Sequence, residues 1–252
     1  MCLKYKFSTP LDSPGRTLEH KNIIRSKLFL RKIYIEWYQH FVQEFSHFKD
    51  KKIIELGSGG GFIKEIMPGV TCSDIQPISG IDMCFSAQSM PFIEKSVHGI
   101  CMINTFHHLA DAGLFLKEVD RVLADNGKLI LIEPANSLWG RFIYKRLHHE
   151  VFDPSAGWNL QKDTPLSVAN GALPWIVFIR DRERLLKLFP NFKIDRIKYH
   201  TPFCYLLSGG MSYKQFVPAW SFVIFKSVDK WLSKVFPQMS MFMTIPISKS
   251  EI

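Results

Sequence analysis

The apolar and polar positions of the chain follow two different periods. Short apolar runs that predict buried strands lie at residues 53–56, 70–73, 97–104 and 128–133. Residues 115–123 instead repeat apolar side chains every three or four positions, which predicts an amphipathic helix. An Asn–Gly pair at 126–127 separates this helix from the strand that follows. Strands that alternate with helices in this order predict a doubly wound α/β fold with a mostly parallel sheet.

The segments on either side predict further elements. From Glu19 to Phe45, apolar residues recur at helical spacing and predict one long N-terminal helix. This helix either packs over the cleft of the α/β domain, the interpretation we favour, or lies on a membrane surface. The later elements expected are a helix at Asp181–Leu188, a sixth strand at Phe192–Tyr199 and a seventh strand at Met239–Ile247.

We therefore expect a seven-stranded sheet in a domain at residues 51–252, preceded by a helical cap at residues 1–50. Two substrate-side insertions, rich in aromatic residues, interrupt the domain at 136–178 and 202–237. The second contains an amphipathic helix with apolar positions at Phe216, Trp220, Val223, Ile224, Val228, Trp231 and Leu232. Such insertions close as lids over a hydrophobic acceptor, or they form a dimer contact or extra core. The sequence leaves these alternatives open.

A glycine-rich turn follows the first predicted strand. Gly57, Gly59, Gly60 and Gly61 form a loop with almost no side chains, so backbone N–H groups can approach a ligand. The dinucleotide fingerprint would need a glycine at position 62, where this chain has phenylalanine. Glu55, two residues before the first glycine, suits a ligand that carries an ammonium group rather than a pyrophosphate.

Asp74 ends the second predicted strand, 17 residues after Gly57. Nucleotide-binding folds place a ribose-binding carboxylate about 20 residues after the glycine turn. A carboxylate there accepts hydrogen bonds from both ribose hydroxyls. We therefore expect Asp74 to bind a ribose rather than to be a solvated loop residue.

Five segments in order carry a family resemblance: ELGSGGG, the acid of CSDIQP, AQSMPF, NTFHHL and EVDRVLADNGKLILIEP. Together they span about residues 50–135, and this succession resembles the class I S-adenosylmethionine (SAM)-dependent methyltransferases. Within that class it is similar to the small-molecule group that includes the quinone-biosynthesis enzymes. The resemblance implies a Rossmann-like sheet, SAM as methyl donor and S-adenosylhomocysteine as product.

The resemblance also implies a set of cofactor-binding residues. These are Glu55, Gly57, Ser58, Gly59, Gly61, Asp74, Ile75, Ala87, Gln88, Asn104 and His107. One departure is visible, because the family often has an aspartate before Ala87 that contacts the adenine amino group, and this chain has Ser86. The adenine contact therefore falls to Ser86, Ala87, Gln88 or the backbone, since Asp82 sits too early, on the third strand.

Composition narrows the class of protein. The chain has 252 residues, 46% hydrophobic and 22% charged, which fits a globular domain with a large core. Its apolar runs stop short of the ~20 residues that a membrane helix needs. Its N-terminus lacks the apolar segment of a signal peptide. The five cysteines are scattered and form no C-x-x-C pair, which disfavours a disulfide framework and a zinc site. We expect a cytoplasmic protein with reduced thiols and no metal.

Charge is distributed unevenly along the chain. The net charge is +6 over residues 1–52, −5 over 53–135 and +8 over 136–252. A basic acceptor side favours an anionic, small or lipid-linked substrate and peripheral contact with an anionic membrane surface, or it is simply a solvated basic face. The charge also suggests an rRNA or tRNA methyltransferase, although nucleic-acid methyltransferase motifs and RNA-binding modules are missing. A third alternative is a non-catalytic SAM-fold protein whose insertions bind a partner.

The expected chemistry is an in-line displacement in which the acceptor attacks the methyl carbon of the sulfonium. The protein mainly aligns the two reactants and excludes water. A general base is needed only for a protonated acceptor, and histidine suits that task near neutral pH. We name His148 and His149, in the first insertion, as catalytic candidates. His107 and His108, after the fourth predicted strand, are assigned to the cofactor edge and are the next candidates.

Overall fold

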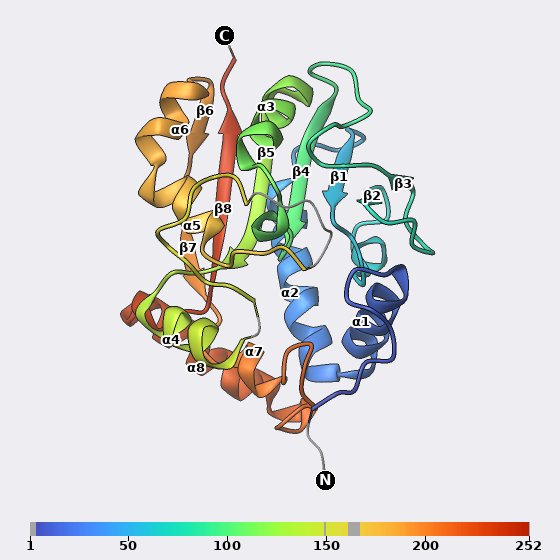
Figure 1. Cartoon of the computed structure of the whole chain (residues 1–252), viewed down its shortest axis with the longest axis vertical. Helices are drawn as coiled ribbons and strands as arrows, with labels where there is room; N and C mark the ends of the chain where they lie inside the picture. Colours follow the sequence, from blue (N-terminus) through green and yellow to red (C-terminus); the bar gives the residue numbers. More distant parts are fainter. Residues whose placement is uncertain (1–3, 149, 161–166, 252) are drawn as a thin grey trace.

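The computed structural model describes residues 4–148, 150–160 and 167–251 (Figure 1). Its strands are β1 Ile53–Leu56, β2 Thr71–Asp74, β3 Met83–Cys84, β4 Val97–Ile103, β5 Leu123–Pro134, β6 Phe192–Ile194, β7 Lys198–His200 and β8 Phe242–Lys249. They form one sheet in the order β3-β2-β1-β4-β5-β8-β6, with β7 also paired to β8. Strands β1 to β5 pair in parallel, and β8 is antiparallel to each of its partners. The mostly parallel, Rossmann-like sheet is confirmed.

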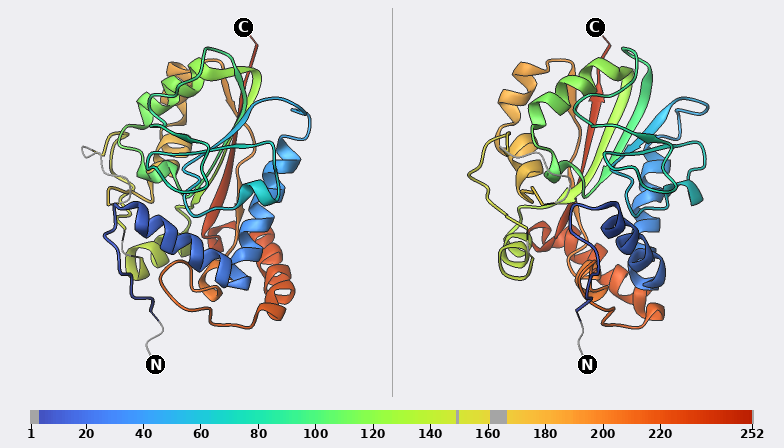
Figure 2. Two further views of the ribbon diagram at one scale, coloured as in Figure 1. Left: turned by 90° about the vertical axis from the view of Figure 1, so that its right-hand side faces the viewer. Right: turned by 45° about the vertical axis from the view of Figure 1, so that its right-hand side comes forward.

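Helices cover both faces of the sheet. They are α1 Pro14–Ser26, α2 Leu28–Glu44, α3 Ala112–Val122, α4 Leu138–Leu147, α5 Leu173–Trp175, α6 Arg182–Leu188, α7 Cys204–Leu207 and α8 Phe222–Val235. With the sheet seen nearly edge-on in Figure 2 (left), α3 and α6 lie on one side and α2 and α8 on the other. Apolar side chains of α2 and α3, among them Phe41 and Phe115, are fully buried. None of the helices among the described residues is long and apolar enough to cross a membrane.

The N-terminal region differs from the predicted single helix. Lys27 leaves the helical conformation (φ −93°, ψ 92°) and separates α1 from α2. Its ammonium donates to the backbone carbonyls of Gly210 and Tyr213, at 2.8 Å for Tyr213. Burial lowers the pKa of Lys27 to about 8. The prediction of one helix from Glu19 to Phe45 was wrong, because a distant loop draws this lysine out of the helical path.

Two predictions about the strands also need correction. The expected sixth strand, Phe192–Tyr199, is two short strands, β6 and β7, that pair with different parts of β8. The sheet therefore has eight strands rather than seven. The Asn–Gly pair at 126–127 lies inside β5, where Asn126 has φ +60° and the register with β4 shifts. It marks an irregularity of the strand rather than a separate connection.

The amphipathic helix of the second insertion is shorter than predicted, and its apolar face points outward. Helix α8 begins at Phe222, so Phe216 and Trp220 precede it. Side chains of Val223, Ile224 and Trp231 are 58–69% exposed. Its Asp229 is buried instead and accepts hydrogen bonds from the Phe203 and Cys204 N–H groups at 3.0 and 2.9 Å. Helix α8 thus holds the start of α7 through a polar contact. A role of the two insertions as lids stays a prediction.

Candidate active site

A cavity of about 900 Å³ lies at the carboxyl ends of β1, β2 and β4. All eleven cofactor-binding residues named from the sequence line it, and so does His148. His149 lies outside the described residues. Parallel strands collect their carboxyl ends at one edge of the sheet, which explains why motifs far apart in the sequence meet there. The sequence therefore located the residues that surround the cavity, although their roles stay predictions.

The glycine loop is tightly folded at one end of this cavity. Gly57 and Gly59 have φ of +66° and +42°, a region that side chains with a Cβ rarely adopt. A Cβ at Gly57 would overlap the side chain of Thr105, and one at Gly61 would overlap the Tyr38 hydroxyl. The loop is closed by hydrogen bonds from the Ser58 N–H to Ser73 O at 2.8 Å and from the Gly61 N–H to Ser58 O at 2.7 Å. Its glycines are thus required by close packing.

Glu55 is buried beside this loop, with 3% of its surface exposed. Its Oε2 has no hydrogen-bond partner among the described residues. Burial and the neighbouring Asp74 raise the pKa of Glu55 to about 8, although a hydrogen bond with Ser58 opposes the shift. A buried acceptor without a donor is costly to a folded protein. The carboxyl therefore suits a ligand that brings a donor or a positive charge.

Asp74 holds the loop from the end of β2. Its Oδ2 accepts a hydrogen bond from the Gly59 N–H, and its Oδ1 accepts one from the Gln76 N–H, both at 3.0 Å. Burial raises the pKa of Asp74 above its usual value, and these backbone bonds counteract part of the effect. The carboxylate lines the cavity next to the loop. It combines a structural contact with free acceptor capacity toward the cavity.

The segment expected to face adenine lines the same cavity. Ile75, 46% exposed, lies there with Ser86, Ala87 and Gln88. Ser86 Oγ accepts a hydrogen bond from the Gln88 N–H at 3.2 Å, and Gln88 Oε1 accepts one from the Asp111 N–H at 2.7 Å. Asp82 directly precedes β3 and receives the Cys72 N–H at 2.8 Å, outside the residues that line the cavity.

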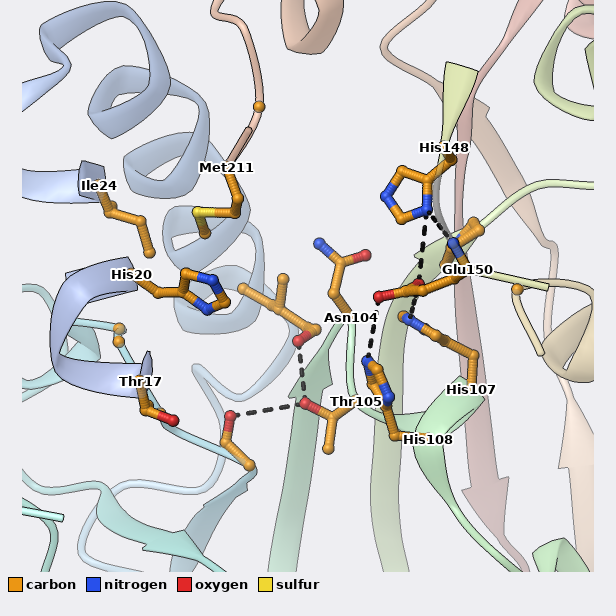
Figure 3. Close-up of a pocket in the computed structure, with 18 of the residues that line it drawn as sticks. Thr17, His20, Ile24, Asn104, Thr105, His107, His108, His148, Glu150 and Met211 are labelled. Carbon is orange, nitrogen blue, oxygen red and sulfur yellow. Dashed lines mark hydrogen bonds and ion pairs between the residues drawn. The ribbon is translucent and has the colours of Figure 1, made fainter. Parts of the chain in front are cut away.

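The N-terminal helices form one wall of the cavity. The sequence did not indicate which of their residues line it. Thr17, His20 and Ile24 of α1 and Tyr34 and Tyr38 of α2 line the cavity. Figure 3 shows the three α1 residues on the opposite side of the cavity from His107, His108, His148 and Glu150. Helical spacing had indicated a helix over the cleft. It could not tell which of its faces meets the cavity, because that depends on the break at Lys27.

A histidine–glutamate cluster lies on the other side of the cavity (Figure 3). It consists of His107, His108, Glu133, His148 and Glu150. His107 Nδ1 lies 2.6 Å from Glu133 Oε2, and His107 Nε2 lies 3.3 Å from Glu150 Oε2. His108 Nε2 lies 3.9 Å from Glu150 Oε1, and His148 Nδ1 lies 3.7 Å from Glu150 Oε2. Glu150 thus meets three imidazole rings (Figure 3). The sequence suggested the two histidine pairs but not that Glu133, at the end of β5, joins them.

The surroundings shift the pKa values of His107 and His108 in opposite directions. Burial lowers the pKa of His107, but Glu133 and Glu150 outweigh it and raise the value to about 10. Burial and the charge on His107 lower the pKa of His108 to about 4. Burial raises the pKa of Glu150, yet the three histidines together hold it below its usual range. The cluster is a buried site of concentrated charge, as is common where proteins bind ions or move protons.

Comparisons with known proteins bear on this arrangement. Residues 54–131 match the model of the methyltransferase-domain family. No curated protein sequence matches the chain. A SAM-dependent methyltransferase from Aquifex aeolicus is 17% identical, with a TM-score of 0.44, over 77% of this chain and 93% of its own. A putative sarcosine dimethylglycine methyltransferase from Galdieria sulphuraria is 13% identical, with a TM-score of 0.49, over 88% of each chain.

A third solved structure, geranyl diphosphate C-methyltransferase from Streptomyces coelicolor A3(2), is 12% identical, with a TM-score of 0.45, over 99% of this chain and 90% of its own. At identities and TM-scores this low, neither the substrate nor the role of any residue can be inferred from these proteins. The matched segment contains β1 except Ile53, the glycine loop, Asp74 and β4, and it ends in β5. The chain thus contains a methyltransferase domain at residues 54–131, and this match and the Rossmann-like sheet support a class I SAM-dependent methyltransferase with SAM as cofactor.

Proposed function

We propose that the enzyme binds SAM at the glycine loop and transfers its methyl group to a small or lipid-linked, anionic acceptor. The acceptor enters from the side of residues 136–178 and 202–237. The observation that carries this proposal is the presence of two unlike groups in the lining of one cavity. One is Glu55, a buried carboxyl whose Oε2 has no hydrogen-bond partner among the described residues, and the other is His107, His108, His148 and Glu150 of the histidine–glutamate cluster.

The cofactor's parts have complementary partners in the cavity wall. The SAM ammonium meets Glu55, and the glycine loop, including Ser58, approaches the methionine portion. Asp74 accepts the ribose hydroxyls, and Ile75, Ala87 and Gln88 contact the adenine. Asn104, which follows β4 with φ +50°, and His107 lie at the edge that faces the sulfonium. In this arrangement residues 1–50 act as a cap on a domain at 51–252.

The protein's own contribution to the reaction is alignment and exclusion of water. The acceptor atom attacks the methyl carbon, the C–S bond breaks, and neutral S-adenosylhomocysteine leaves. An acceptor hydroxyl also loses a proton, and we assign its uptake to His148, which lines the cavity. Glu150, 3.7 Å from His148 Nδ1, would stabilise the resulting imidazolium.

The proposed class of acceptor rests on the net charge of the C-terminal part of the chain. The net +8 of residues 136–252 favours an anionic substrate and peripheral contact with an anionic membrane at the cytoplasmic face. A screen of purified enzyme, SAM and either anionic lipid-linked compounds, soluble small molecules or bulk RNA tests this assignment. Methylation of RNA alone would contradict it. SAM binding without turnover on any acceptor would favour a binding protein instead.

A first prediction concerns the pH dependence of SAM binding. Glu55 is mostly protonated below its pKa of about 8 and must lose its proton to pair with the SAM ammonium. The SAM dissociation constant should therefore fall as pH rises from about 6 to about 8, by up to about tenfold per pH unit. Calorimetry in buffers of different ionisation enthalpy should show about one proton released per SAM near neutral pH. Glu55→Gln should remove this proton release, and an unchanged release in that variant would exclude Glu55 as its source.

A second prediction concerns the ribose. Asp74→Ala removes a carboxylate that would accept two hydrogen bonds, each worth about 1.5–3 kcal/mol when charge-assisted. We expect SAM affinity to fall at least tenfold by calorimetry. Asp82→Ala is the matched control, because its carboxylate receives the Cys72 N–H outside the cavity lining. Equal SAM affinity of Asp74→Ala and wild type would remove Asp74 from the site.

A further inference from the structure

Three side chains that can ligate a metal ion, those of His107, His108 and Glu150, converge within the histidine–glutamate cluster. One ring nitrogen each of His107 and His108 and a Glu150 carboxylate oxygen lie within 4.8 Å of one another, and both Nε2 atoms lie 3.3–3.9 Å from Glu150. His107 is 3% exposed, and the side chains of His108 and Glu150 are 13% and 20% exposed. All three residues line the cavity (Figure 3). The three groups are close enough to hold one ion between them.

The hydrogen bonds on the far side of each ring determine where its proton sits. Glu133 is an acceptor, because its Oε1 receives the Thr105 and Phe106 N–H groups at 2.8 and 2.7 Å. His107 Nδ1 therefore donates to Glu133 Oε2 at 2.6 Å. His108 Nδ1 donates to the Val168 carbonyl at 3.2 Å, since a carbonyl can only accept. In their neutral forms both rings then direct the Nε2 lone pair toward Glu150.

We propose that His107 Nε2, His108 Nε2 and the Glu150 carboxylate bind a divalent transition-metal ion such as Zn²⁺. Two imidazoles and one carboxylate are a common ligand set for such ions in enzymes. The 3.3 Å between His107 Nε2 and Glu150 Oε2 is close to the roughly 3.3 Å that separates two ligands of tetrahedral zinc at bond lengths of about 2.0–2.1 Å. Glu150 turns its other oxygen, Oε1, toward His108 at 3.9 Å.

The outer contacts of the two rings support this assignment. Metal-binding histidines usually donate their second N–H to a carboxylate or a backbone carbonyl, which fixes the ring and its tautomer. Here Glu133 and Val168 supply one of each. A divalent ion would also neutralise the two carboxylates, Glu133 and Glu150, whereas a single proton on His107 leaves one negative charge in the cluster. The expectation of no metal rested on cysteine spacing, which does not report on a site of this kind.

This site deepens the proposed function and rests on it for its role. Three protein ligands leave at least one coordination position open, and the cavity gives access to it. An acceptor hydroxyl bound there would ionise more readily, as metal-bound water does. Its proton passes to His148, the oxygen forms the new C–O bond, and the C–S bond of SAM breaks. The ion keeps its oxidation state. The site would thus select acceptors with an oxygen able to bind the metal.

Metal binding itself provides the test. Protein stripped with a chelator is titrated with Zn²⁺ by calorimetry and with Co²⁺ by visible absorption, and elemental analysis gives the stoichiometry. We expect one ion per chain, and at least a hundredfold weaker binding in His108→Ala and in Glu150→Gln. Glu133→Gln should weaken binding by about 10–100-fold through the orientation of His107. His47→Ala, an exposed histidine outside the residues that line the cavity, should bind the ion as wild type does.

Two outcomes would overturn the proposal. One is stripped wild-type protein that binds no Zn²⁺ or Co²⁺, and the other is binding that His108→Ala and Glu150→Gln leave unchanged. Circular dichroism of each variant establishes that it is folded. SAM affinity of the stripped protein separates this failure from that of the proposed function. If SAM binds at the loop while no ion binds, only the metal site is wrong, whereas loss of SAM binding in folded protein contradicts the proposed cofactor site.

Discussion

Gly57→Ala should abolish measurable SAM binding, with a loss of at least a hundredfold in affinity. Gly57 has φ +66°, and the added Cβ would overlap the Thr105 side chain. A residue other than glycine in this left-handed conformation costs about 1 kcal/mol or more, and the overlap adds to it. Relief of the strain and of the overlap requires the loop or Thr105 to shift, and a shift of the loop would move its N–H groups away from the proposed cofactor site. We also expect a lower melting temperature, measured by thermal unfolding beside the calorimetric titration with SAM.

Gly69→Ala is the matched control for this substitution. A Cβ at Gly69 would have no heavy atom within 4 Å, and its backbone is outside the positive-φ region. Its SAM affinity and melting temperature should stay close to those of wild type. If Gly57→Ala bound SAM as tightly as Gly69→Ala, the loop would not be the cofactor site.

His148→Ala should slow methyl transfer by about 10²–10⁴-fold, the usual contribution of a general base. SAM affinity should remain nearly unchanged, because His148 is assigned to the acceptor and not to the cofactor. The expected effect applies to a hydroxyl acceptor, whose proton must leave during the reaction. Single-turnover rates at saturating SAM, together with calorimetry, measure both quantities. His47→Ala controls for the loss of a histidine elsewhere.

Full turnover in the double variant His148→Ala/His149→Ala would contradict this role. It would show that the two residues have a structural function only. His107 or His108, which line the same cavity, would then be the next candidates in protein that binds no metal ion there. In metal-free protein, a His107→Ala or His108→Ala variant with normal SAM affinity but slow turnover would support that alternative.

The part of the fold nearest the glycine loop could be predicted because local signals agree there. Strand β1, the loop and β2 occupy 22 consecutive positions, Ile53 to Asp74, and period, turn chemistry and spacing all favour the same structure. The break at Lys27 could not be predicted in this way. It depends on the carbonyls of Gly210 and Tyr213, more than 180 residues away.

The same limit applies to the candidate site. His107 and His108 were expected at the end of β4 because their position follows from the strand. Their contacts with Glu133 and Glu150 were not expected, since those residues come from the end of β5 and from the first insertion. For the apolar residues of α8, the sequence left open whether they form a lid, a dimer contact or extra core. Amphipathic spacing tells which residues share a face, and not whether that face meets the protein or its surroundings.

The wall formed by α1 and α2 affects how the protein can be divided. Residue 50 is a natural boundary for the sheet, whose first strand begins at Ile53. It is no boundary for the cavity, because Thr17, His20 and Tyr38 line one side of it. Lys27 further ties the helix junction to the loop around Gly210. The two portions are therefore not interchangeable modules, and exchanging the helical portion between homologous enzymes would alter the shape available to cofactor and acceptor at once.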